Sequence, residues 1–235
     1  MFEGACPQIR ESVYGIMGLS QIGKKVNATN GAGFMIAPNY ITTVAHVTHY
    51  ENNFSKPNHQ RFEIIRTLDI GIPSKNASLV FEDPVRDIAI LKVDDPSSKI
   101  SVVLDSSIKP PGTPCGSLGF PLSGVTFNKD GTRSWNLQER FRSAYISRFF
   151  PELRMGRPLT FYETDTAMYE GSSGCPGFLA DGKVMGMQVA TVNMNKVIQV
   201  GKGKQRQTQT ERTAISIWIP SPDIISFAKQ KGVLP

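Results

Sequence analysis

Three side chains in this sequence are of the types that together carry out acyl transfer: a histidine, a carboxylate and a hydroxyl. His46 follows the run Thr-Val-Ala and is expected to close an apolar strand. Asp87 comes directly before four apolar residues, so its carboxylate is expected at the mouth of a core, where it needs hydrogen-bond donors. Ser173 stands in a Gly-Ser-Ser-Gly turn at 171–174, whose glycines permit a strained backbone with its N–H groups directed into one concavity. An exposed hydroxyl beside such donors is what an acyl-transfer nucleophile requires.

Each of these signals has a plainer explanation when it is taken alone. A histidine at a strand end is usually structural, an aspartate before a strand is often a turn residue, and a Gly-Ser-Ser-Gly run can be an ordinary loop. The three residues occur in the order His46, Asp87, Ser173, which is the chain order of the chymotrypsin class and not that of subtilisin or the α/β-hydrolases. Ser172 is a competing nucleophile in the same turn.

The composition of the chain excludes several classes of protein. It has 235 residues, of which 40% are hydrophobic and 20% charged, so it is not a disordered chain. It has no sustained heptads and no apolar run long enough to span a membrane, which excludes a coiled coil and a transmembrane protein. Three cysteines make no disulfide framework, and charged residues interrupt the N-terminal segment before a secretory signal can form. We therefore expect a protein of a reducing compartment, in the cytoplasm.

Short segments rich in β-branched and aromatic residues follow one another along most of the chain, separated by turns of Pro, Asn, Asp and Gly. These predicted strands form two runs, one on each side of a connector at 94–111 that is rich in Pro, Ser, Asp and Lys. Only 221–231 has the pattern of a helix, with Ser221 as its candidate N-cap. The polar stretch 201–212 is interpreted as a long hairpin loop.

The two runs of strands indicate two β lobes joined near residue 100. We expect an N-terminal lobe at 1–100 that carries His46 and Asp87. The C-terminal lobe at 101–235 would carry Ser173 and the terminal helix. A catalytic site assembled across the cleft between two lobes would explain why its residues are divided in this way.

A series of short motifs gives the chain a resemblance to a known family. In order these motifs are GAGFMI at 31–36, TVAHV at 43–47, RDIAILKV at 86–93, LGFP at 118–121, TD at 164–165, GSSGCPG at 171–177, GMQV at 186–189 and IWIP at 217–220. With them the sequence resembles a chymotrypsin-fold, trypsin-like serine protease of the HtrA/Deg type, over roughly residues 30–231. The resemblance implies an all-β fold of two six-stranded antiparallel β-barrels, followed here by the C-terminal α-helix.

The resemblance also implies a role for each site residue. Ser173 is the nucleophile, His46 the general base and then the general acid, and Asp87 orients the imidazole. The backbone N–H groups of Gly171 and Ser173 form the oxyanion hole. The family frame G-x-S-G-x-P favours Ser173 over Ser172 as the nucleophile. In place of the second Gly of the family motif stands a cysteine, which adds bulk behind the turn.

Alignment to the family places the substrate-binding pocket just before the nucleophile turn and along a later strand. The expected pocket residues are Ala167, Met168, Glu170, Gln188, Val189 and Ala190. Because Ala167 aligns with the base of the pocket and is apolar, we expect small or medium apolar side chains at P1. Glu170 at the rim would add affinity for basic residues.

The sequence gives no sign of a cofactor or a metal. His46 and His49 have no Cys or carboxylate at ligand spacing beside them, so a metal site is not expected. The net charge is +6, but the basic stretch 202–212 lacks interleaved aromatic residues, so nucleic acid is not an expected partner. The expected partner is a protein or peptide substrate, no membrane is involved, and the oligomeric state stays open. The leading function is a serine endopeptidase, and the alternative is a silent or latent module of the same fold that binds a peptide or protein.

Overall fold

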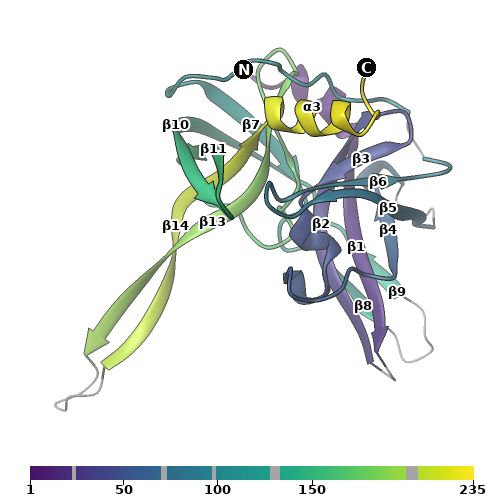
Figure 1. Ribbon diagram of the computed structural model, residues 1–235, viewed down its shortest axis with the longest axis horizontal. Helices are drawn as coiled ribbons and strands as arrows, with labels where there is room; N and C mark the ends of the chain where they lie inside the picture. The colour runs from purple at the N-terminus through teal and green to yellow at the C-terminus, as the bar shows by residue number, and fades with distance from the viewer. Residues whose placement is uncertain (23–24, 70–72, 97–98, 128–132, 200–205) are drawn as a thin grey trace.

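The structure is a computed structural model in which strands dominate (Figure 1), and it describes residues 1–22, 25–69, 73–96, 99–127, 133–199 and 206–235. The first barrel closes six antiparallel strands in the order β1-β2-β3-β6-β5-β4. Its strands are β1 (Val13–Ile22), β2 (Lys25–Ala37), β3 (Tyr40–Thr43), β4 (Arg61–Ile65), β5 (Lys75–Asp83) and β6 (Ile88–Lys92). The apolar run 88–91 of β6 is completely buried, as expected for a strand covered on both faces.

The second barrel closes six antiparallel strands in the order β10-β11-β14-β13-β12-β7. Its strands are β7 (Pro114–Gly119), β10 (Arg140–Arg154), β11 (Arg157–Thr164), β12 (Pro176–Phe178), β13 (Val184–Gln199) and β14 (Arg206–Pro220). Trp218 of β14 lies in its core, 1% exposed, and its indole N–H donates to Thr164 Oγ1 of β11 over 3.0 Å. A separate hairpin, β8 (Gly124–Phe127) and β9 (Arg133–Asn136), stands beside the barrels. These two closed barrels and the terminal helix confirm the fold class that the sequence predicts.

Helices are few and short, and three sequence predictions about helices and their boundaries are wrong. The helix α3 (Ser221–Gln230) confirms the terminal helix, but α1 (Ala5–Arg10) and α2 (Ala45–Thr48) were not expected. Two 3-10 turns, η1 (Tyr50–Asn52) and η2 (Thr67–Asp69), complete the described helical elements. The prediction that His46 closes a strand is wrong, because β3 ends before it and His46 lies in α2. Ser221 is not the N-cap either, since its hydroxyl donates to Asp105 O and α3 has no side-chain cap.

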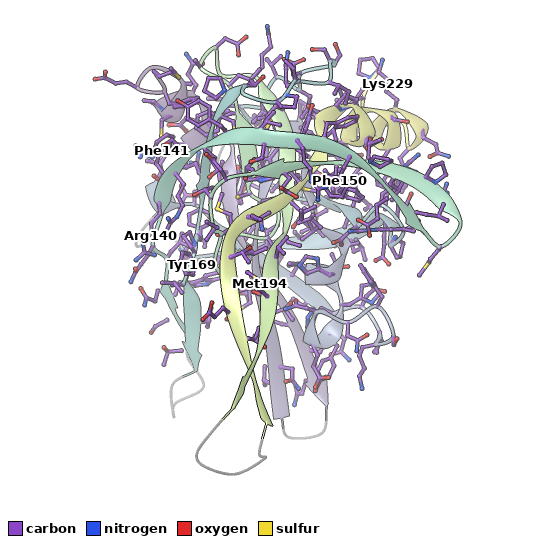
Figure 2. All side chains as sticks on the ribbon, turned by 90° about the vertical axis from the view of Figure 1, so that its left-hand side faces the viewer. Arg140, Phe141, Phe150, Tyr169, Met194 and Lys229 are labelled. Atoms are coloured by element: carbon purple, nitrogen blue, oxygen red, sulfur yellow. The ribbon has the colours of Figure 1, made fainter. Side chains whose placement is uncertain are left out.

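The ribbon formed by β13 and β14 extends far beyond the second barrel (Figures 1 and 2). Its two strands pair as far as Gln199 and Arg206. The prediction of a loop at 201–212 is therefore wrong for 206–212, which belong to β14, and 201–205 lie outside the described residues. Met194, labelled on this ribbon in Figure 2, is 52% exposed.

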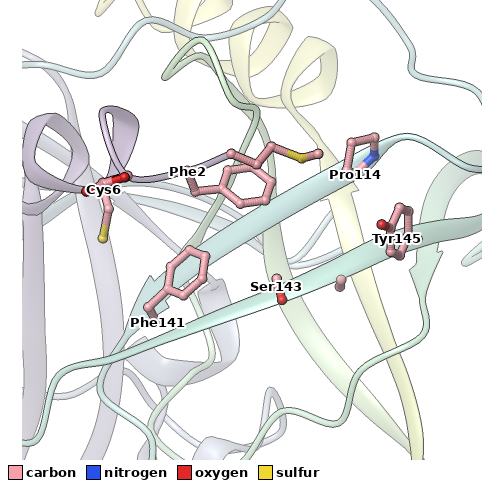
Figure 3. A pocket seen from close by; sticks show the side chains of 9 residues that line it. Phe2, Cys6, Pro114, Phe141, Ser143 and Tyr145 are labelled. Atoms are coloured by element: carbon pink, nitrogen blue, oxygen red, sulfur yellow. The ribbon is translucent and has the colours of Figure 1, made fainter.

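The N-terminal segment packs against the second barrel, which ties the start of the chain to β7 and β10 (Figure 3). The Phe2 ring lies 5.8 Å from the Phe141 ring and 5.9 Å, edge-on, from the Phe178 ring, between centroids. Such aromatic pairs add about 0.5–1.5 kcal/mol each beyond their burial. A cavity of about 460 Å³ lies beside this cluster, with Cys6 at its edge. No helix within the described residues has both the length and the apolar character needed to cross a membrane.

Candidate active site

His46 and Asp87 lie in direct contact at the rim of the first barrel. The His46 Nδ1 and Asp87 Oδ2 atoms are 2.8 Å apart, and the His46 backbone N–H donates to Asp87 Oδ1 over 2.8 Å. Because the carboxylate accepts both bonds, the proton of the neutral imidazole is held on Nδ1 and Nε2 is left as the acceptor. Asp87 is buried, whereas His46 is partly exposed. The pair is therefore fixed on the protein side and open on the Nε2 side.

A tight turn between β5 and β6 holds Asp87 in this position. Asp83 Oδ1 accepts the backbone N–H groups of Val85 and Arg86 over 3.0 and 3.2 Å, which closes the turn. Asp87 itself has φ +60°, a left-handed conformation that costs a non-glycine residue about 1 kcal/mol or more. Arg157 of the second barrel lies 3.6 Å from Asp83, so both barrels contribute to the turn. The strain at Asp87 is offset by the two hydrogen bonds of its carboxylate with His46.

Ser173 is carried by a turn whose backbone is fixed from several sides. Gly174 N–H donates to Gln188 O over 2.8 Å, and Ser173 O accepts the N–H of Ala32 from the first barrel over 2.7 Å. Gly171 and Gly174 both have φ +89°. A Cβ atom on Gly174 would lie 2.0 Å from Ala32 O, so no other residue fits at this position.

Replacing Gly174 with alanine is expected to lower the free energy of unfolding by about 3 kcal/mol or more, because φ strain and a backbone clash add together. Gly112→Ala is the matched control: Gly112 has φ +84°, but a Cβ there meets nothing within 4 Å. That control should cost only about 1–2 kcal/mol. Urea unfolding of both variants measures the difference, and equal shifts of the two midpoints would show that the clash with Ala32 is relieved at no cost.

His46 and Ser173 line the same cleft, which has a volume of about 550 Å³. The remaining lining comes from segments 28–30, 51–52, 122–123 and 170–171, so both barrels and the loops around them form its walls. Among the described residues no hydrogen bond joins Ser173 Oγ to His46 Nε2. Such bonds are often long in the absence of substrate and shorten when it binds.

The backbone donors expected to form an oxyanion hole are free in this structure. Within the part of the chain that is described, nothing accepts a hydrogen bond from the N–H groups of Gly171 or Ser173. Their neighbours, in contrast, are used: Ser172 N–H donates to Tyr169 O, and Cys175 N–H donates to Ser172 O. Gly171 and Ser173 both line the cleft.

The structure separates the two adjacent serines by burial. Ser172 is 1% exposed, whereas Ser173 is partly exposed and lines the cleft. Behind the turn, the side chain of Cys175 packs against Gly119, where a Cβ would lie 2.7 Å from the Cβ of Cys175. The glycine of β7 thus makes room for the cysteine, and burial raises the pKa of the Cys175 thiol, which keeps it protonated.

Of the six residues predicted to bind substrate, only Glu170 lines the cleft. Met168 and Val189 are buried, Ala167 is partly exposed and Ala190 is exposed. Gln188 is 2% exposed, and its buried Oε1 atom has no hydrogen-bond partner. The assignment of these five residues to a P1 pocket stays a prediction.

The other two histidines, His49 and His59, form hydrogen bonds that stabilise the fold. His49 Nε2 lies 2.9 Å from Glu82 Oε1, and its Nδ1 lies 2.7 Å from Lys56 O. His59 bridges Ser20 Oγ and Thr29 Oγ1, each over 2.8 Å. In the described part of the chain no group of three or more His, Cys, Asp or Glu side chains could hold a metal ion.

Thr29 connects His59 to the cleft. Its hydroxyl donates to Val47 O over 2.8 Å, so it accepts from Nε2–H of His59, and the Ser20 hydroxyl donates to Nδ1. Sequence reasoning missed Thr29 as a lining residue, as it missed Asn30, Glu51 and Leu122, because no chemical motif marks them. Only the folding of separate segments around His46 and Ser173 brings these residues together.

Acid is expected to destabilise the protein through His59. Burial lowers the pKa of His59 to about 4, from 6.5. Between these values the unfolded chain binds a proton that the folded protein excludes, so stability falls as the pH falls, by up to about 3 kcal/mol. Urea unfolding near neutral pH and near pH 4 measures this loss. The wild type should lose about 3 kcal/mol more than His59→Gln, and an equal loss would rule out His59 as the titrating group.

Comparison with known proteins agrees with this geometry. Residues 31–187 match the trypsin-like peptidase domain family. A probable periplasmic serine endoprotease, DegP-like, from Halomonas elongata is 30% identical over 158 residues, which are 67% of this chain and 28% of that protein. The chain thus spans under a third of the length of this curated relative.

Solved structures show the same fold. The active form of the Rv3671c protease from M. tuberculosis superposes with a TM-score of 0.66 at 19% identity, over 98% of this chain and 85% of that one. An inactive form of the same protease gives 0.64 at 17% identity, over 97% and 93%. The family match covers both His46 and Ser173 and most of both barrels. The chain therefore belongs to the trypsin-like peptidase family, the serine proteases of chymotrypsin fold.

Proposed function

We propose that this chain is a serine endopeptidase that cleaves protein or peptide substrates through Ser173, His46 and Asp87. The observation that carries the proposal is the 2.8 Å contact between His46 Nδ1 and Asp87 Oδ2 at the edge of a cleft that Ser173 also lines. This contact presents the Nε2 atom of His46 as a base on the side of the substrate. The membership of the family and the DegP-like relative support the same reading.

In the proposed mechanism, Ser173 Oγ attacks the carbonyl carbon of the scissile peptide bond while His46 Nε2 takes its proton. The resulting oxyanion accepts hydrogen bonds from the N–H groups of Gly171 and Ser173. His46 then gives its proton to the leaving amine, and the acyl group stays on Ser173. A water molecule, deprotonated by His46, hydrolyses this ester and restores the enzyme. Asp87 stabilises the imidazolium that forms in both steps.

A fluorophosphonate probe tests the proposed nucleophile directly. The wild-type protein should react to form a covalent adduct, and peptide mapping by mass spectrometry should place it on Ser173. Heat-unfolded protein is the control, because the reaction depends on the folded site. An adduct on Ser172 would instead identify Ser172 as the nucleophile. A folded protein that forms no adduct and cleaves no peptide, yet binds peptides, would favour the silent or latent module instead.

A further inference from the structure

The cleft carries a charge opposite to that of the whole protein. The chain has a net charge of +6. Among the described residues that line the cleft, however, the acidic side chains are Glu51 and Glu170, and none is Lys or Arg. Both carboxylates are exposed, and neither forms an ion pair with a described residue. Two carboxylates in the cleft of an otherwise basic protein create a local negative potential beside the reacting atoms.

The backbone around each carboxylate is fixed. Glu170 directly precedes the nucleophile turn, and its carbonyl accepts the N–H of Leu122 over 2.8 Å. Glu51 lies in η1, where it has φ +57°, and the next residue, Asn52, is also left-handed. Glu51 and Glu170 line the cleft from opposite barrels, together with His46 and Ser173.

Two described arginines of the second barrel, Arg140 and Arg142, are engaged elsewhere and do not neutralise this charge. Arg140 donates to Pro121 O over 2.6 Å and to Gln138, and the Arg142 guanidinium lies over the Tyr169 ring, 5.1 Å from its centroid. Neither arginine lines the cleft. The Glu51 carboxylate interacts with the Tyr50 hydroxyl, but neither glutamate has a cationic partner among the described residues, so both can pair with a cationic group that enters with the substrate.

The position of the cleft relative to Ser173 indicates which part of a peptide it receives. The residues expected to hold the P1 side chain, apart from Glu170, do not line it. Its walls are instead segments 28–30 and 122–123. An extended substrate crosses Ser173 from the P1 side to the leaving-group side, so the cleft faces the residues that follow the scissile bond.

We propose that Glu51 and Glu170 select peptides with a Lys or Arg side chain within the first few residues after the scissile bond. This inference rests on the proposed peptidase function and adds the chemistry of its substrate. It leaves the small or medium apolar P1 side chain expected from Ala167 unchanged, but it assigns the Glu170 carboxylate to a residue after the scissile bond. Exposed ion pairs of this kind each contribute modestly, so the two together predict a preference of roughly five- to ten-fold.

Cleavage of a randomised peptide library, mapped by mass spectrometry, provides the first test. Lys and Arg should be enriched after the scissile bond. Peptides with Lys, norleucine or Glu at the enriched position then give kcat/KM values. The Lys-to-norleucine ratio should be roughly five to ten for the wild type and about one to two for the double variant Glu51→Gln/Glu170→Gln. The wild-type ratio should also fall when salt is raised to about 0.5 M.

A double variant with the same change in net charge is the matched control. Glu3→Gln/Asp94→Asn removes two exposed carboxylates outside the cleft, and Asp94 follows the end of β6 that lies away from Asp87. Its Lys-to-norleucine ratio should equal that of the wild type. A ratio that falls equally in both double variants would assign the effect to the net charge of the protein and overturn the proposal.

Binding distinguishes failure of the inference from failure of the peptidase function. Fluorescence anisotropy of labelled peptides with Ser173→Ala measures affinity without cleavage. The Lys peptide should bind more tightly than the norleucine peptide, and Glu51→Gln/Glu170→Gln in the same background should abolish the difference. Cleavage with no preference for Lys overturns the inference and leaves the peptidase function standing. Lys-selective binding without cleavage or probe labelling in the wild type supports the carboxylate site and refutes the peptidase.

Discussion

Replacing Ser173 with alanine is expected to lower kcat for peptide cleavage by at least roughly a thousandfold, because the hydroxyl of the adjacent Ser172 is buried and cannot take its place. The loss should appear in kcat while peptide binding is retained, since alanine removes one oxygen from the floor of the cleft and leaves its walls intact. Stopped assays with mass-spectrometric detection of products measure the residual rate, and anisotropy measures binding.

Ser172→Ala is the matched control for this change. It removes the same atom from the adjacent residue, but Ser172 is 1% exposed and faces away from solvent. Its activity should stay within a few-fold of the wild type, as expected for a residue that does not touch substrate. The opposite pattern, with Ser172→Ala inactive and Ser173→Ala active, would make Ser172 the nucleophile.

Replacing Asp87 with asparagine is expected to lower kcat by about ten-thousandfold while the fold is retained. The amide keeps one oxygen, which can still accept the backbone N–H of His46. Its NH₂ group then faces His46 Nδ1 and stabilises the tautomer with the proton on Nε2. That tautomer has no acceptor for the Ser173 proton, so the general base is lost although every residue stays in place.

Asp94→Asn is the control for the change of charge, because Asp94 is an exposed carboxylate at the other end of β6. Thermal unfolding should show both variants folded. If Asp87→Asn kept near wild-type kcat in steady-state assays, Asp87 would have a structural role and His46 would need another partner.

Much of the fold could be predicted from the sequence because its signals are local. The run 88–91 is continuously apolar and bounded by turns, so it predicts a buried strand whatever its partners are. The terminal helix has an amphipathic pattern with Pro222 near its start and Gly232 at its end, and the structure confirms it. Elements without such a pattern were missed. The four-residue α2 spans barely one helical turn and is too short to show an i, i+3, i+4, i+7 pattern, so the residues around His46 were interpreted as a strand.

The candidate site, like the fold, could be predicted from the sequence only in part. Chain order and residue type were enough to select His46, Asp87 and Ser173 as candidates. In the structure His46 contacts Asp87, and His46 and Ser173 line the cleft. The conformation of Asp87 was not predictable, because a left-handed aspartate is stable only where the Asp83 turn and the His46 N–H hold it. The walls of the cleft were not predictable either.

By itself the sequence determined that this chain forms barrels and carries a histidine, a carboxylate and a hydroxyl in the order of one protease class, because short-range patterning and motif order are written along the chain. Only the tertiary structure decided which serine is exposed, which backbone donors stay unpaired and that Glu51 stands in the same cleft as Glu170. The physical reason is that burial, hydrogen-bond satisfaction and local charge depend on which segments meet in space. Residues far apart along the chain meet only after both barrels have closed.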